Sequence, residues 1–196
     1  MPRPAYLDEE ESQVSINKRE TLAAARKLRA LMSQDIPLID PSDRAKFLNQ
    51  PLGTLGDLLA PSDAAILPKR LLRTPVSTDT TLLDAYSAAG RFNPISKTNY
   101  LQGGLGEISL FPASRFHQAS PIGESSLANE LAPYRTLIHE AGHARGFGNV
   151  GNLVYPDIKD ASSLLRANRQ RSIDYLLDEP YAEALADSVL RARGLK

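Results

Sequence analysis

"TLIHEAGHARGFG", Thr136 to Gly148, is the stretch of the chain that decides its fold and its chemistry. It contains two of the three histidines in the sequence, four residues apart, and a glutamate directly after the first of them. Positions i and i+4 lie on one face of an α-helix, so His139 and His143 can direct their imidazole nitrogens at one point. Two imidazoles that converge in this way are typical of a zinc site.

The glutamate, Glu140, lies beside that point rather than on it. A carboxylate in this position can take a proton from a zinc-activated water and pass it to the leaving amine, which is the chemistry of HExxH metallopeptidases. The neighbours Ala141, Gly142 and Ala144 are small and allow this helix to pack closely under the site. The alternative is a surface helix that carries the same two histidines and glutamate but binds no metal. That alternative does not account for their spacing or for the small residues beside them.

A zinc site needs a third protein ligand, and the composition narrows the choice. The chain has no cysteine, so the remaining ligand types are His, Asp and Glu. No third histidine follows at the spacing of the pattern HExxHxxGxxH: Gly146 stands at its glycine, but Asn149 stands at the position of its third histidine. We therefore expect a carboxylate from a more distant segment.

That segment is "DEPYAEALADSVL", which carries Glu179, Glu183 and Asp187 at intervals of four residues. On a helix these carboxylates share one face, where one can bind metal and the next can accept a hydrogen bond from a ligating histidine. Two registers fit: Glu179 as ligand with Glu183 behind it, or Glu183 as ligand with Asp187 behind it. Pro180 belongs in a first helical turn, which leaves Glu179 at the N-cap and favours the second register.

The rest of the chain predicts an α+β fold that is rich in helix and has a small sheet. Apolar spacing predicts a helix from Ile16 to Ser33. Residues 36–80 and "TLLDAYSAAG" predict short helices, with turns or ends at Pro41, Pro51, Pro61, Pro68 and Gly90. Glu107 to Phe111 alternates and stops at Pro112, as an edge or near-edge strand does. Three later helices are expected: Pro133 to Gly146 or Gly148, Ala161 to Leu177, and Pro180 to Arg193.

These elements predict one compact domain with three parts: a flexible N-terminus at residues 1–15, a helical region at 16–100 and a core at 101–196. The 23 basic and 23 acidic residues give a net charge of zero, so the chain lacks the overall basic footprint of nucleic-acid binding. No stretch reaches the roughly 18 apolar residues of a membrane span, and the N-terminus lacks the apolar centre of a secretory signal. We expect a cytoplasmic protein, although delivery by a specialised secretion system fits the same sequence, and the oligomeric state is not indicated.

HEAGH followed some tens of residues later by a helix with ExxA(D/E) resembles the gluzincin group of zinc metallopeptidases. The likeness extends over about Gly106 to Arg191 and is greatest to three groups: the metallopeptidase domains of plasmid antirestriction proteins, the phage-immunity-region peptidases and anthrax lethal factor. In the last two, the ligand glutamate precedes an alanine by three positions and an acidic or amide residue by four, as Glu179 precedes Ala182 and Glu183 here. The resemblance implies a zincin-like core, bound Zn2+ and Glu179, ahead of Glu183, as its third ligand.

Two further features of the site are expected. Zincins usually place an edge strand beside the cleft, where the substrate backbone can pair with it, and Glu107 to Phe111 is the candidate. The oxyanion formed from the scissile carbonyl needs a donor besides zinc. Tyr175 is the first candidate, followed by Tyr155 and Tyr181, whereas the loop residue His117 is left outside the site.

These observations predict a zinc metalloendopeptidase that hydrolyses peptide bonds in a protein or peptide substrate, with Glu140 as general base. The alternative is a zincin-fold binding module of the antirestriction type that acts by protein or nucleic-acid contact without proteolysis. Residues 1–100 could also form a partner-binding or inhibitory region of a peptidase. The peptidase is favoured because a structural zinc site has no use for a carboxylate at Glu140.

Overall fold

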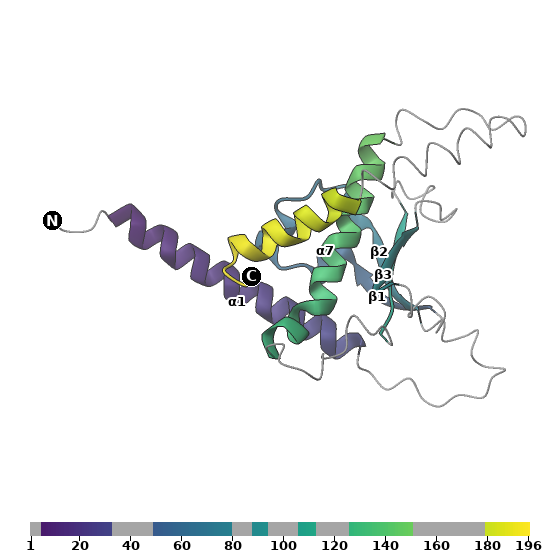
Figure 1. The fold of residues 1–196 in the computed structure, drawn as a ribbon, viewed down its shortest axis with the longest axis horizontal. Helices are drawn as coiled ribbons and strands as arrows, with labels where there is room; N and C mark the ends of the chain where they lie inside the picture. Colours follow the sequence, from purple (N-terminus) through teal and green to yellow (C-terminus); the bar gives the residue numbers. More distant parts are fainter. Residues whose placement is uncertain (1–4, 33–48, 80–87, 94–105, 113–125, 151–178) are drawn as a thin grey trace, which may run out of the picture.

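The computed structural model describes residues 5–32, 49–79, 88–93, 106–112, 126–150 and 179–196. In this part of the chain a four-stranded sheet lies on one side of a long helix, α7 (Ser126–Val150). A second long helix, α1 (Ala5–Met32), also packs along α7 (Figure 1). The C-terminal helix, residues 179–192, crosses α7 (Figure 1). The expected mixture of helices and a small sheet is therefore confirmed.

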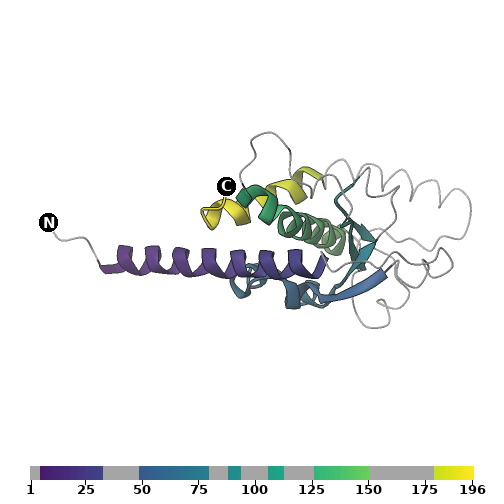
Figure 2. The ribbon, with the colours of Figure 1, turned by 90° about the horizontal axis from the view of Figure 1, so that it is seen from below.

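Helix α1 confirms the helix predicted from Ile16 to Ser33 but begins earlier, at Ala5. Its C-terminal half packs into the molecule through Ala25, Leu28 and Met32. Its N-terminal half projects from the rest of the described structure (Figure 2). The predicted flexibility of residues 1–15 stays a prediction.

The sheet is formed by β1 (Asn49–Thr54), β2 (Pro75–Asp79), β3 (Gly90–Asn93) and β4 (Glu107–Leu110), in the order β1-β2-β4-β3. Strand β4 pairs in parallel with β2 and antiparallel with β3. The strand predicted at Glu107 to Phe111 is therefore present, as Glu107–Leu110, and it has the near-edge position that its pattern allowed. It is not the edge strand that the sequence also proposed beside the cleft, because β3 lies outside it. Pro112 follows the paired residues, so its missing N–H interrupts neither ladder.

Residues 49–79 contain both the predicted short helices and two strands that were not predicted. The short helices are α3 (Leu55–Leu58), α4 (Pro61–Ala64) and the 3-10 turn Leu71–Arg73. Thr54 and Asp57 form a capping box at the start of α3. Pro51 lies in β1, which is tolerated because β1 has a neighbour on one side only within the described sheet.

Gly90 begins β3 instead of ending a helix, so the prediction for this glycine is wrong. A Cβ at this position would lie 2.9 Å from Cγ2 of Thr136 and 3.1 Å from Cγ of Glu140. The absence of a side chain therefore allows the strand to approach α7 closely. The remainder of the helix predicted for "TLLDAYSAAG", and the one predicted at Ala161 to Leu177, lie outside the described residues.

Helix α7 begins before Pro133, which the sequence placed at its start, and continues through Gly146 and Gly148 to Val150. A proline inside a helix removes the hydrogen bond to the carbonyl four residues earlier, here that of Asn129. Nη1 of Arg29 donates to this carbonyl at 2.6 Å, so α1 supplies the missing partner. A glycine inside a helix costs only about 1 kcal/mol relative to alanine, which is why the two glycines do not end α7.

The core is one hydrophobic cluster in which α1, α3, the sheet and α7 meet. Its fully buried members include Leu28, Leu55, Val76, Ile108, Leu110, Tyr134 and Leu137. Residues from the predicted parts 16–100 and 101–196 thus share a single cluster.

A buried polar network crosses this core at Asp63, which is 2% exposed. Its carboxylate accepts hydrogen bonds from Thr21 Oγ1 at 2.8 Å and from the hydroxyl of Tyr134 at 2.8 Å. It also accepts one from Nε of Arg193, at 2.9 Å. The Tyr134 oxygen in turn accepts the N–H of Ala60 at 2.9 Å, and burial raises the pKa of this tyrosine far above its usual value. The network ties α1, α4 and α7 to the end of the C-terminal helix.

The C-terminal helix begins close to the residue expected from Pro180 and contacts α7 at a glycine. A Cβ on Gly142 would lie 2.7 Å from Cα of Ala182 and 3.0 Å from its Cβ. We expect Gly142→Ala to force the two helices apart and to lower the free energy of unfolding by about 1–3 kcal/mol. Thermal unfolding followed by circular dichroism measures this, and a melting temperature equal to that of the wild type would show that the contact is not tight.

Candidate metal centre

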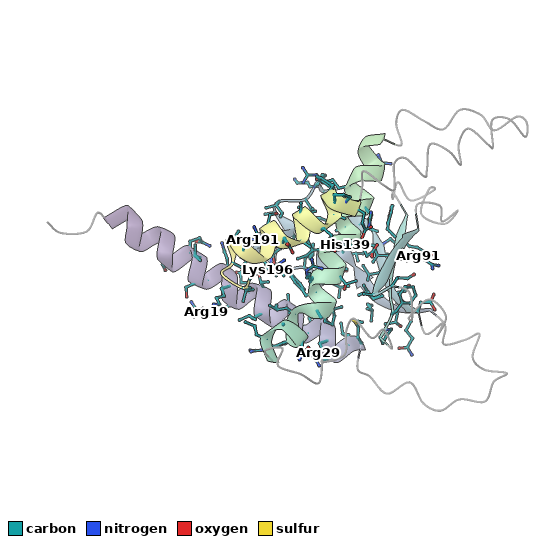
Figure 3. All side chains as sticks on the ribbon, viewed as in Figure 1. Arg19, Arg29, Arg91, His139, Arg191 and Lys196 are labelled. Carbon is teal, nitrogen blue, oxygen red and sulfur yellow. The ribbon has the colours of Figure 1, made fainter. Side chains whose placement is uncertain are left out.

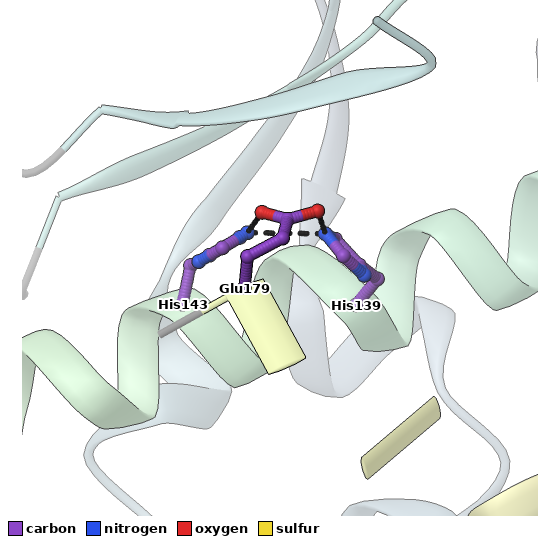
Figure 4. A group of neighbouring side chains, drawn as sticks. All are labelled: His139, His143 and Glu179. Carbon is purple, nitrogen blue, oxygen red and sulfur yellow. Dashed lines mark hydrogen bonds and ion pairs between the residues drawn. The ribbon is translucent and has the colours of Figure 1, made fainter. Parts of the chain in front are cut away.

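His139 and His143 on α7 meet Glu179 of the C-terminal helix at one point (Figure 4). The Nε2 atoms of the two histidines are 3.0 Å apart. Glu179 places one carboxylate oxygen 3.3 Å from Nε2 of His139 and the other 3.1 Å from Nε2 of His143. One nitrogen or oxygen from each residue therefore lies within 4.8 Å of the others, although Glu179 follows the histidines by tens of residues.

The chemistry and spacing of this group fit a zinc ion. Catalytic zinc sites take three protein ligands of this kind and leave the fourth position free. Ligands about 2.0–2.1 Å from a tetrahedral ion lie about 3.3 Å from one another, close to the distances observed here. The side chains of the two histidines are 12% and 13% exposed and that of Glu179 is 41% exposed, so the group is accessible from one side. Burial also lowers the pKa of His139, which favours the neutral imidazole that metals bind.

Behind this group lies a second layer of polar side chains. Nδ1 of His139 is buried and has no hydrogen-bond partner among the residues that the structure describes, and Oε1 of Glu183 lies 3.4 Å from it, outside hydrogen-bonding alignment. The other oxygen of Glu183, Oε2, accepts a hydrogen bond from Nη2 of Arg135. The same nitrogen of Arg135 donates to Oδ1 of Asp187 at 3.0 Å. Glu179 therefore lies with the Nε2 atoms of the two histidines, whereas Glu183 lies near Nδ1 of His139, the outer nitrogen of that ring.

Glu140, which directly follows His139, is 5% exposed. It accepts a hydrogen bond from the backbone N–H of Phe92 in β3. Burial, together with the charge of Glu179, raises its pKa to about 7, against the opposing effects of His143, the Phe92 N–H and Arg91. A carboxyl group with a pKa near neutrality is well matched to general-base work.

The remaining residues named from the sequence are three tyrosines, His117 and Asp187, of which the structure describes Tyr181 and Asp187. Tyr181 lies on the C-terminal helix and is 39% exposed, whereas Tyr175, Tyr155 and His117 fall outside the described residues. Asp187 contacts Arg135 and Lys196, and no contact with a histidine is found among the described residues.

Sequence reasoning missed two features of the site, Arg135 and strand β3. Arg135 precedes His139 by four residues and so shares its helix face, a signal that the spacing contains. Strand β3 is only four residues long and has no apolar alternation. In the view of Figure 3 His139 lies between the C-terminal segment, on which Arg191 and Lys196 are labelled, and the strand that carries Arg91.

Comparison with known proteins gives no relative for this chain: no family model, no curated protein and no solved structure matches it. The resemblance to gluzincins therefore stays a prediction that rests on the site residues. Across the described part of the chain no helix is both long and apolar enough to cross a membrane.

Proposed function

We propose that this chain is a zinc-dependent metallopeptidase. The observation that carries the proposal is the convergence of His139, His143 and Glu179, whose ligand atoms come from two different helices and lie within 4.8 Å of one another. Solvated surface side chains that bind no metal are not expected to place three potential ligands, two imidazoles and a carboxylate, at tetrahedral spacing.

In this proposal the three converging side chains hold the ion. A bound zinc ion supplies Lewis-acid polarisation of the scissile carbonyl and acidifies water. Glu140 accepts the proton from the attacking water and delivers it to the leaving amine. Its burial and the hydrogen bond from Phe92 hold the carboxylate in place.

The substrate backbone would pair with an edge strand beside Glu140. Within the described sheet β3 is the outer strand on this side, and its Phe92 already bonds to Glu140. Strand β3 therefore takes the role that the sequence assigned to Glu107 to Phe111, because β4 has neighbours on both sides.

The direct test is metal content together with hydrolysis of an unfolded protein such as casein. We expect full-length protein purified without chelator to contain about one zinc ion per chain. Dialysis against a chelator should stop hydrolysis, and added zinc should restore it. A chain that neither retains nor takes up zinc would refute the proposal. A chain that binds zinc but hydrolyses nothing would favour the binding module instead.

A further inference from the structure

Two glutamates one helical turn apart compete for the same histidine. Glu179 faces Nε2 of His139 at 3.3 Å, and Glu183 faces Nδ1 of the same ring at 3.4 Å. Both carboxylates are partly exposed, at 41% and 46%, so burial does not decide which of them is the ligand. Some other contact must assign their roles.

Arg135 makes a contact that distinguishes them. It lies one helical turn before His139, on the same face of α7. Its guanidinium binds Glu183 and, at 3.0 Å, Asp187. No contact between Arg135 and Glu179 is found in the described residues.

We propose that Arg135 is a positioning residue that holds Glu183 behind His139 and so leaves Glu179 to the metal. This inference rests on the proposed zinc centre. A guanidinium presents several N–H donors in a rigid plane, so binding to two carboxylates fixes both their position and the register of the helix that carries them. With one oxygen of Glu183 held by Arg135, the other remains directed at Nδ1 of His139. A carboxylate there orients a ligating imidazole and raises its basicity.

The charges around Glu183 and Asp187 show why loss of Arg135 would affect the position of Glu183 more than that of Asp187. Asp187 also pairs with Lys196, and Arg191 lies 3.8 Å away. For Glu183, Arg135 and His139 are the only basic partners found in the described part of the chain. Removal of Arg135 would leave carboxylates one turn apart that repel each other, with Glu183 free to leave His139.

The backbone contact between the two helices has a separate role. Gly142 against Ala182 sets how closely the two helices approach. It places no charge beside either glutamate. Arg135 is thus the contact that selects between them.

The test is the zinc affinity of the full chain, measured by competition with a chromophoric chelator. We expect Arg135→Met and Glu183→Gln each to weaken zinc binding by about 10- to 100-fold, as loss of an outer partner of a ligating histidine does. The double variant should bind about as tightly as either single variant, because Arg135 acts through Glu183. Arg191→Met is the matched control: it removes an exposed arginine that approaches the same Asp187, and its affinity should stay within about twofold of the wild type.

Two further measurements separate positioning from a general loss of structure. The visible spectrum of the Co2+-substituted protein should change in Arg135→Met and stay unchanged in Arg191→Met. Arg135→Lys keeps the charge but cannot reproduce the planar fork, so it should restore part of the affinity. If Arg135→Met does not unfold cooperatively, the lysine variant alone decides, with a partial loss of affinity supporting the inference and wild-type affinity overturning it.

Wild-type affinity in Arg135→Met, or losses that multiply in the double variant, would overturn the role of Arg135 while leaving the zinc centre intact. A wild-type chain that binds no zinc would instead refute the proposed function itself.

Discussion

The variant Glu140→Gln is expected to lose about 10²- to 10⁴-fold in the rate of peptide hydrolysis and to keep its zinc. Glutamine has nearly the same shape as glutamate and can still accept the hydrogen bond from Phe92, but it cannot take a proton from water. The proposed ligands are other residues, so the metal should remain. Initial rates on casein and zinc content per chain, measured on the same preparation, give both quantities.

Glu130→Gln is the matched control for this variant, because it makes the same chemical change on the same helix. Glu130 forms an ion pair with Arg26 at the surface and has no role in the proposed metal centre. We expect the wild-type rate for this control. Wild-type hydrolysis by Glu140→Gln, or loss of its zinc, would contradict the role given to Glu140.

The variant Asp63→Ala is expected to lose about 3–5 kcal/mol of unfolding free energy. The substitution removes the acceptor of two buried hydrogen bonds, from Thr21 and Tyr134, and of a partly buried one from Arg193. It leaves the cation of Arg193, whose side chain is 12% exposed, without its carboxylate. Urea unfolding measures the loss, which corresponds to a fall of roughly 6–20 °C in melting temperature for a domain of this size.

The surface pair of Arg26 and Glu130 provides the comparison, because it also joins α1 to α7 but is exposed. Glu130→Gln should cost at most about 1 kcal/mol. Equal losses in the two variants would show that burial of the Asp63 network does not add to stability.

The helix that carries the histidines could be predicted because its information is local. The spacing of His139 and His143 and the small residues between them can be recognised without knowledge of the rest of the chain. That Ala182 approaches one of these small residues, Gly142, is known only from the structure. The choice between Glu179 and Glu183 could not be made in this way. Both lie on one helix face, and the contact that distinguishes them comes from Arg135, on another helix.

The errors in the fold have the same origin. Pro133 indicates a helix start locally, yet α7 continues through it because Arg29 of α1 binds the carbonyl that the proline leaves unpaired. Glu107 to Leu110 has the pattern of a strand, but its position between β2 and β3 depends on segments far away in the sequence. Gly90 is typical of a helix end, whereas its function here is to let β3 approach Glu140.

The most direct test of the zinc centre is a crystal structure of the zinc-loaded chain with anomalous scattering measured at the zinc absorption edge. We predict a single strong peak about 2.0–2.2 Å from Nε2 of His139, Nε2 of His143 and a carboxylate oxygen of Glu179, with Glu183 on the outer nitrogen of His139. No peak between the two histidines, or a peak that has Glu183 in place of Glu179 as its third ligand, would contradict this account.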